Sequence, residues 1–211
     1  MPFVWGAFPS WALTDPAQGR TRRLEAFYDD LENGTLPEVA WVDPSWATGG
    51  TQSTDEHPPA NPQIGQAWLR DVVMRLMASP QWAETALIVT YDEHGGFFDH
   101  VAPPEACPPG DFDPEGGGGG FDYDHLGFRV PLVIVSPYAR AGYVSDRVTD
   151  HSSILRLLEA RYQLPALTGR DANAWPLLDM FDFASPPFVA PPELAESPVD
   201  GARNADCLAE F

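Results

Sequence analysis

The sequence contains few basic residues and no long apolar segment. Only 12 of its 211 residues are Lys or Arg, against 31 Asp or Glu, which gives a formal net charge of -19 at pH 7. Nucleic-acid-binding proteins need a basic surface, and anionic membranes attract basic segments, so neither is expected as a partner. No window is long and apolar enough to cross a bilayer, and residues 1–6 lack the basic and apolar regions of a signal peptide.

Cysteine is also scarce, because the chain has only Cys107 and Cys207. The two residues either form a disulfide in an oxidising compartment or remain separate thiols in loops. Their spacing matches no zinc-binding motif. Apolar residues are plentiful, since 44% of the chain is hydrophobic and 12% is aromatic. This supply is sufficient for one packed domain.

Hydrophobic periodicity predicts helices and strands in alternation. Apolar residues at helical spacing follow Asn61-Pro62, a pair that suits the start of a helix. Continuous apolar runs predict strands that are buried on both faces, as in a parallel sheet covered by helices. The predicted elements are a helix at 21–33, a strand at 36–42, a helix at 61–80, strands at 85–91 and 129–137, and a helix that opens at 150–153. This order favours an α/β fold.

Two segments are predicted to be irregular. Residues 102–125 form a long loop with five consecutive glycines, which lacks the Lys and Ser or Thr of a phosphate-binding P-loop and is interpreted as a flexible spacer. Residues 184–211 are rich in proline and polar residues, and we expect an extended tail there.

The strongest chemical signal is the pair Asp92-Glu93, directly after the predicted strand at 85–91. Ligands of open α/β sheets bind at the carboxyl ends of strands. Two adjacent carboxylates at such an edge repel each other unless a cation neutralises them. Gly95-Gly96 follows at once and allows the backbone to turn sharply beside a ligand. The sequence therefore predicts a divalent metal site with Asp92 and Glu93 as ligands.

All five histidines directly follow an acidic residue, and two of them are candidates for catalysis. His57 lies in a polar loop one helix before Asp92, and could serve as a metal ligand, a phosphate donor or a proton donor to the leaving oxygen. The alternative is a solvent-exposed loop histidine. His151 opens a helix and could point at the site, although Asp150 as an N-cap explains the motif equally well.

Three further groups could belong to a site or could simply fix loops. Asp99-His100 could be a hydrogen-bonded pair within its loop, and Asp124-His125 could shape access of a substrate. Arg129 could bind phosphate or form an ion pair with one of the many carboxylates. No Ser or Thr occurs in the context of a nucleophile, and Gly-x-Ser-x-Gly is absent, so an α/β-hydrolase has no support.

Several motifs occur together in a fixed order. They are Gly34-Thr35-Leu36-Pro37, Asp55-Glu56-His57-Pro58-Pro59, Ser79-Pro80-Gln81-Trp82, the segment 91–104, Leu126-Gly127-Phe128-Arg129-Val130-Pro131, Ser136-Pro137-Tyr138, Asp150-His151-Ser152-Ser153-Ile154-Leu155 and Leu167-Thr168-Gly169-Arg170-Asp171. This set resembles the phosphoesterase family of bacterial phospholipases C and related acid phosphatases, within the alkaline-phosphatase-like superfamily.

The resemblance implies a fold, a reaction and a set of roles. Residues 1–183 would be the C-terminal part of a catalytic domain with a partial alkaline-phosphatase-like fold, in which helices flank a mostly parallel sheet. Asp92 and Glu93 would bind a divalent metal ion, and His57 would line the phosphate site. The Ser or Thr nucleophile would lie upstream, in an N-terminal half that this chain lacks.

The expected activity is therefore hydrolysis of a phospholipid or another phosphate ester, of the phospholipase C type. The alternatives are an acid phosphatase that acts on phosphomonoesters and an inactive metal-binding fragment. The resemblance also implies a secreted or periplasmic protein.

Overall fold

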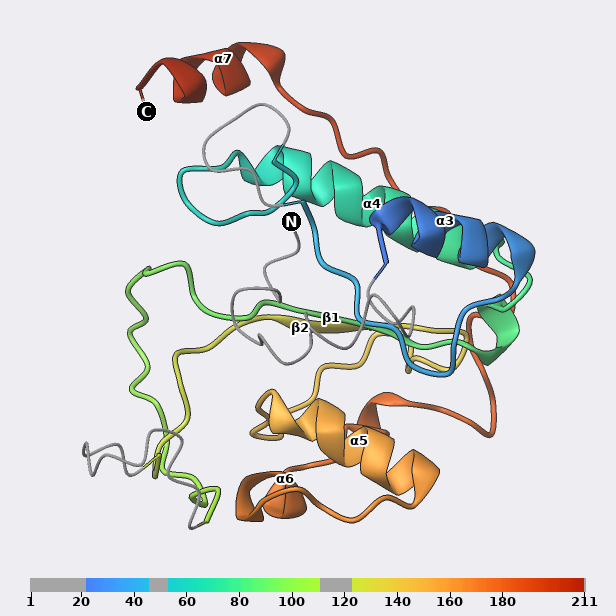
Figure 1. Ribbon diagram of the computed structural model, residues 1–211, viewed down its shortest axis with the longest axis vertical. Coiled ribbons are helices and arrows are strands. Elements are labelled where there is room, and N and C mark those ends of the chain that lie inside the picture. Colours follow the sequence, from blue (N-terminus) through green and yellow to red (C-terminus); the bar gives the residue numbers. More distant parts are fainter. Residues whose placement is uncertain (1–21, 46–52, 111–122, 211) are drawn as a thin grey trace. The chain divides into compact units, whose positions relative to one another are not determined.

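The computed structural model describes residues 22–45, 53–110 and 123–210, which divide into two units by their internal packing (Figure 1). One unit comprises residues 1–85 with 190–211, and the other comprises residues 86–189. The predicted glycine spacer at 116–120 lies outside the described residues. The boundary predicted at residue 183 stays a prediction.

Two helices form the core of the first unit. Helix α3 (Leu24–Asn33) packs alongside α4 (Pro62–Ala78), and a 3-10 turn, η1 (Trp82–Glu84), follows α4 (Figure 1). The most buried apolar side chains of the pair, at 0 to 3% exposure, are Leu31, Val72 and Leu76. A hydrogen bond of 3.1 Å from Trp68 Nε1 to the Tyr28 hydroxyl also links the helices.

Both helices begin and end close to the positions predicted from sequence. Asn61 caps α4, because its side-chain oxygen accepts a hydrogen bond of 3.0 Å from the backbone of Gln63. The last residue of α4 is Ala78, directly before Ser79-Pro80. Gly34 ends α3 in the left-handed conformation that is common at this position.

The strand predicted at 36–42 is wrong, because these residues are irregular in the structure. The backbone of Leu36 bonds to a side chain instead of a neighbouring strand: its N–H donates to Gln81 Oε1 at 2.8 Å, and its carbonyl accepts from Gln81 Nε2 at 3.4 Å. Pro37 has no N–H to give to a sheet. Alternation of apolar residues was therefore not sufficient to form a strand here.

The predicted extended tail contains a helix, α7 (Gly201–Glu210). Asp200 Oδ1 accepts hydrogen bonds from the backbone of Ala202 and Arg203, so an Asp cap precedes this helix. The backbone N–H of Asp200 in turn donates to Gln63 Oε1 at 2.7 Å, which ties the start of α7 to the start of α4 (Figure 1). Because the tail is rich in proline, the prediction overlooked the Asp200 cap and the short helix that follows it.

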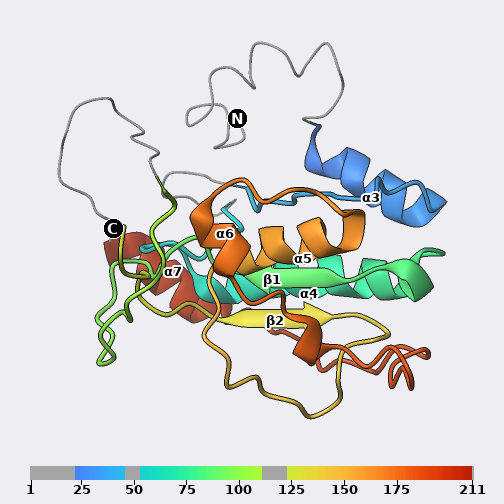
Figure 2. The ribbon, with the colours of Figure 1, turned by 90° about the horizontal axis from the view of Figure 1, so that it is seen from below.

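The second unit is built on a two-stranded sheet. Strands β1 (Leu87–Thr90) and β2 (Leu132–Val135) pair antiparallel, with Thr90 opposite Leu132 and Leu87 opposite Val135 (Figure 2). Helices and strands mix along the chain as predicted, but the described strands do not form the mostly parallel sheet that was expected. An apolar run indicates a strand and not the direction of its partner. The β1 residues are half-buried and not fully buried.

Two helices and a returning segment follow the sheet. Helix α5 (Ser152–Tyr162) packs against the short α6 (Gly169–Asn173), and η2 (Leu178–Met180) comes next. The returning segment holds the chain that leaves β2: Arg140 donates its backbone N–H to the Met180 carbonyl, and Asp182 donates to the Tyr138 carbonyl. Leu177, between α6 and η2, is completely buried.

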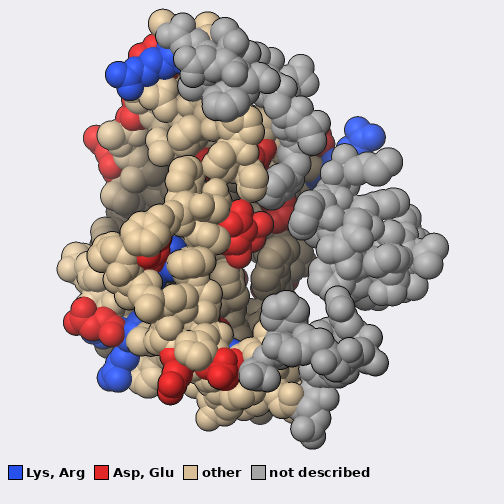
Figure 3. All heavy atoms as spheres, turned by 90° about the vertical axis from the view of Figure 1, so that its left-hand side faces the viewer, with Lys and Arg blue, Asp and Glu red and all other residues tan. Residues whose placement is uncertain are grey.

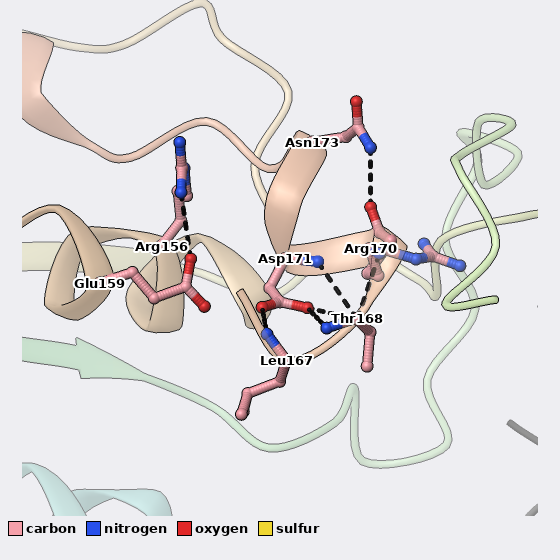
Figure 4. A network of polar contacts seen from close by, with 8 residues as sticks. Arg156, Glu159, Leu167, Thr168, Arg170, Asp171 and Asn173 are labelled. Carbon is pink, nitrogen blue, oxygen red and sulfur yellow. Dashed lines mark hydrogen bonds and ion pairs between the residues drawn. The ribbon is translucent and has the colours of Figure 1, made fainter. Parts of the chain in front are cut away.

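A buried pair of carboxyl groups joins α5 to α6 (Figure 4). Asp171 is 1% exposed and accepts hydrogen bonds from the backbone of Leu167 and Thr168. Burial raises the pKa of Asp171, but hydrogen bonds from Thr168, Glu159 and Leu167 outweigh burial and leave its pKa below the ordinary range. Glu159 is 5% exposed, and its Oε2 lies 3.2 Å from Arg156 Nη1 (Figure 4). The adjacent Asp171 carboxyl and burial raise the pKa of Glu159, so Glu159 takes up a proton at a higher pH than Asp171 does.

The contact between α3 and α4 can be tested by removing Leu31. We expect Leu31→Ala to lower the free energy of unfolding by about 2 to 5 kcal/mol, because a fully buried leucine leaves a cavity. Urea denaturation would measure the change. Leu194 of the same unit is 37% exposed, and Leu194→Ala is the matched control with a smaller expected loss. Equal losses in both variants would contradict this description of the core.

The carboxyl pair predicts how stability changes with pH. The pKa of Glu159 in the folded chain is raised above its ordinary 4.5. The contribution of Glu159 to the free energy of unfolding is therefore complete below pH 4.5, and it is lost as the pH rises through the folded-state pKa. Asp171 acts in the opposite sense and loses its contribution as the pH falls below its ordinary 3.8. In Glu159→Gln the amide can donate to Asp171 at every pH. We therefore expect this variant to gain melting temperature relative to the unaltered chain between pH 5 and pH 8.

Exposed Glu193 offers a control, since Glu193→Gln should show no such gain. A constant difference between Glu159→Gln and the unaltered chain across this pH range would show that Glu159 is not the group that holds the proton.

Candidate functional site

The chain leaves β1 in a turn that carries the predicted metal ligands. Asp92 and Glu93 follow Thr90 and Tyr91, and the side chains of both are exposed. Gly95 and Gly96 have φ values of 68° and 74°, in the left-handed region that glycine adopts without strain. The sharp turn predicted from the two glycines is confirmed. We call residues 92–96 the carboxylate turn.

Hydrogen bonds within the carboxylate turn orient Glu93. Its Oε2 accepts the backbone N–H of Gly95 at 2.7 Å and lies 3.4 Å from His94 Nδ1. The His94 ring in turn packs against Phe128, with 4.4 Å between the ring centroids. His94 therefore contributes to the shape of the turn. Among residues 22–45, 53–110 and 123–210, no group of three or more His, Cys, Asp or Glu side chains is arranged to hold a metal ion.

Asp99 and Arg129 form a bidentate ion pair just after the carboxylate turn. Arg129 Nε lies 2.8 Å from Asp99 Oδ2, and Arg129 Nη2 lies 2.7 Å from Asp99 Oδ1. Asp99 also accepts the backbone N–H of Val101 at 3.0 Å. The Arg129 guanidinium, followed by this backbone bond, holds the pKa of Asp99 well below its usual range. Of the two roles open to Arg129, the structure has the ion pair.

His151 lies beside the other end of the carboxylate turn. Its Nε2 is 2.8 Å from the carbonyl oxygen of Tyr91, the residue directly before Asp92. A carbonyl oxygen can only accept, so Nε2 carries the hydrogen of this bond. Asp150 accepts the backbone N–H of Ser152 at 2.6 Å and so helps to fix the start of α5, but the N-cap position is His151, one residue later than predicted.

His57 belongs to the first unit, whereas the carboxylate turn and His151 belong to the second. His57 is exposed, and its Nδ1 lies 2.7 Å from the Pro58 carbonyl oxygen. Asp55 holds this loop: it is 6% exposed, it accepts the backbone N–H of His57 at 3.0 Å, and its other oxygen accepts the Ser53 hydroxyl. Gly65 of α4 allows the loop to approach, because a Cβ there would lie 2.4 Å from Glu56 Cγ.

The remaining acidic-histidine pair and the cysteine lie at the ends of the long loop. His125 Nδ1 is 2.7 Å from Asp124 Oδ1, and both side chains are exposed. A β-bridge between Glu105 and His125 brings the two ends of the loop together. Cys107 is an exposed free thiol.

The sequence did not predict two contacts that lie beside the candidate site residues. It did not assign Asp55 as the residue that fixes the His57 loop, although an Asp two positions before a residue often accepts its backbone N–H. It also did not connect Asp99 with Arg129, because the two are 30 positions apart. No signal in a single sequence marks such a pair.

Acidic side chains are spread over the face shown in Figure 3 in several separate groups, and the basic side chains stand apart from one another. A phosphate group is therefore repelled at long range and must be bound by local contacts. None of the helices in the described ranges combines the length and apolar character that crossing a membrane would require.

Adjacent exposed carboxylates at a strand end suit the binding of a divalent cation, which assists many reactions of phosphate esters. Comparison with known families agrees, because the model of the Phosphoesterase family matches residues 7–165. The chain belongs to the phosphoesterase family.

Three relatives show the range of the similarity. The chain is 40% identical over 181 residues to phospholipase C B of Mycobacterium tuberculosis, which covers 80% of this chain and 34% of the relative. It is 33% identical over 204 residues to non-specific phospholipase C6 of Arabidopsis thaliana, covering 88% and 39%. It is 35% identical over 191 residues to non-hemolytic phospholipase C of Burkholderia pseudomallei, covering 77% and 25%. The chain thus spans about a third of the length of these relatives.

The Asp99–Arg129 pair predicts a measurable change in titration. Because the pKa of Asp99 is lowered, the pair contributes stability above the ordinary value of 3.8 and loses it as the pH falls further. We expect Arg129→Gln to raise the pKa of Asp99 toward its ordinary value. Carboxyl ¹³C chemical shifts, followed from pH 2 to pH 6, would measure it.

Arg203→Gln is the control, since Arg203 pairs with Asp200 at 3.7 Å, within the other unit. A titration midpoint of Asp99 that is the same with and without Arg129 would show that the ion pair does not form in solution.

Proposed function

We propose that this chain supplies the cation-binding carboxylates of a phospholipase-C-like phosphoric-ester hydrolase. One observation carries the proposal: Asp92 and Glu93 are exposed side by side at the end of β1, on a turn formed by two left-handed glycines. Membership of the phosphoesterase family and relatives that are named phospholipases C support it. Membership of the alkaline-phosphatase-like superfamily is part of the same proposal.

The donor atoms of the turn suit a hard divalent cation. Carboxylate oxygens are the preferred ligands of such ions, and two neighbouring carboxylates lose their mutual repulsion when a cation binds. Two side chains do not complete a coordination shell, so further ligands would come from outside the turn. Asp92 and Glu93 would hold the cation, and the bound cation would supply positive charge that stabilises phosphoryl oxygens and a hydroxyl nucleophile.

His57 would bind the phosphate group and protonate the leaving oxygen. Its Nδ1 faces the Pro58 carbonyl at 2.7 Å, so Nδ1 carries a hydrogen and Nε2 is the nitrogen that would face the phosphate group. Asp55 fixes the backbone from which this ring projects. A histidine held in this way can donate to a phosphoryl oxygen when it is protonated.

The nucleophile is proposed to be a Ser or Thr from family sequence outside this chain. The chain contains no Ser or Thr in a nucleophile context, and about two thirds of the length of its relatives lies outside the matched region. The hydroxyl would attack phosphorus, the leaving oxygen would take a proton, and water would then release the phosphate from the phospho-enzyme.

Two other functions are compatible with the same carboxylates. An acid phosphatase would take phosphomonoesters in place of phospholipids and other diesters. An inactive metal-binding fragment would bind the cation without turnover. A secreted or periplasmic location, inferred from the family, stays a prediction.

Metal binding by the purified chain tests the assignment of Asp92 and Glu93. We expect Mn²⁺ to bind weakly, with a dissociation constant of about 1 mM, because only two protein ligands are assigned. Asp92→Asn and Glu93→Gln should each weaken binding at least about tenfold, since each removes one charged ligand. Electron paramagnetic resonance of free Mn²⁺ measures the affinity.

Asp124→Asn is the matched control, because Asp124 is an exposed carboxylate beside a histidine in the same unit. If it weakens Mn²⁺ binding as much as Asp92→Asn does, the carboxylate turn is not the site. Binding without turnover is the result expected of this chain alone, because the proposed nucleophile lies outside it. Metal-dependent turnover by the chain alone would contradict that placement of the nucleophile; p-nitrophenyl phosphorylcholine as substrate would then indicate the phospholipase, and p-nitrophenyl phosphate alone the phosphatase.

A further inference from the structure

The carboxylate turn has little packing of its own to hold it. A Cβ at Gly96 would meet no atom within 4 Å, so this part of the turn is surrounded by open space. The next residues, Phe97 and Phe98, are 67% and 91% exposed. Cation ligands need a fixed spacing, because a loose pair of carboxylates loses binding energy to the ordering of its backbone. The side chains that restrain this turn therefore determine how well Asp92 and Glu93 could bind a cation.

Restraints occur at both ends of the turn. On the side of β1, His151 Nε2 binds the carbonyl oxygen of Tyr91 at 2.8 Å. On the far side, Asp99 is fixed by Arg129 through two short bonds, at 2.7 and 2.8 Å. The Asp99 side chain is 13% exposed and that of Arg129 is 60% exposed, so the carboxylate is shielded from water and the guanidinium is not.

The residues that provide these restraints are themselves anchored. Arg129 lies three positions before β2, which pairs with β1 along its whole length. His151 directly precedes α5, where Asp150 accepts from the Ser152 backbone and the Asp150 backbone donates to the Ser153 hydroxyl. These two reciprocal bonds fix the start of the helix. Both restraints thus connect the turn to regular structure within the same unit.

We propose that His151 and the Asp99–Arg129 pair are positioning residues that hold the carboxylate turn from its two ends. This inference rests on the proposed function, because it assumes that Asp92 and Glu93 bind the cation. It gives His151 an indirect role: the hydrogen on Nε2 is engaged by Tyr91, so this nitrogen serves to fix the backbone and does not exchange protons with a substrate.

The unaltered chain provides the first test. Long-range ¹H–¹⁵N spectra of ¹⁵N-labelled protein distinguish the two imidazole tautomers. We expect His151 above pH 7 to carry its hydrogen on Nε2, as the bond to Tyr91 requires. A His151 ring with its hydrogen on Nδ1 would overturn the proposal without any substitution.

The second test uses amide hydrogen exchange of residues 91–100. His151→Ala and Arg129→Ala should each speed exchange there about fivefold to tenfold, the effect of one lost hydrogen bond. His151→Gln should restore the slow rates, because its amide can donate to the Tyr91 carbonyl. The same variants should weaken Mn²⁺ binding, and the variant with the faster amide exchange at residues 91–100 should bind Mn²⁺ more weakly. A general loss of folding would speed exchange in both units and would not be rescued by glutamine.

Two controls match the variants. His125→Ala removes an exposed histidine that pairs with Asp124, and Arg203→Ala removes an exposed arginine that pairs with Asp200. Neither should change exchange at 91–100. Unchanged exchange in both His151→Ala and Arg129→Ala, or equal changes in the controls, would overturn the inference.

The experiments distinguish a failure of the positioning role from a failure of the proposed metal binding. If the unaltered chain binds no Mn²⁺ but shows the expected tautomer and exchange pattern, the metal role of Asp92 and Glu93 fails and the restraint of the turn stands. If Mn²⁺ binds through Asp92 and the variants behave as the unaltered chain does, the proposed function stands and His151 and Arg129 are not positioning residues.

Discussion

The antiparallel pairing of β1 with β2 determines the arrangement of the candidate site. Thr90, the last residue of β1, lies opposite Leu132, the first residue of β2. The chain therefore leaves β1 at the same end of the sheet at which it enters β2. This is why Phe128 can pack on His94 and why Arg129 can bind Asp99. In a parallel pair the start of one strand lies beside the start of the other, and these contacts could not form.

In a chain with so many acidic residues, individual carboxylates depend on nearby partners to remain ionised. With a net charge of -19, every carboxylate lies in a negative field that raises the cost of keeping it ionised. Asp99 is stabilised by Arg129, and Asp171 is stabilised by hydrogen bonds from the backbone of Leu167 and Thr168. Asp92 and Glu93 are exposed and adjacent instead, which is the arrangement that a bound cation stabilises.

Sequence patterns predicted local features well and pairings poorly. The Asn61 cap, the end of α4 before Ser79-Pro80 and the turn at Gly95-Gly96 follow from properties of one or a few neighbouring residues. The strand predicted at 36–42 did not form, because its backbone bonds to the side chain of Gln81. The helix α7 was missed, because the proline-rich composition around it outweighed a single Asp cap.

By itself the sequence determined the family, the position of the carboxylate turn and the residues that carry its charge, because each depends on short motifs that can be read along the chain. Only the tertiary structure decided that the described sheet is antiparallel, that Arg129 binds Asp99, and that His151 holds the Tyr91 carbonyl. These contacts join residues 30 and 60 positions apart. Such pairs form when packed elements bring their ends together, and a single sequence carries no local record of them.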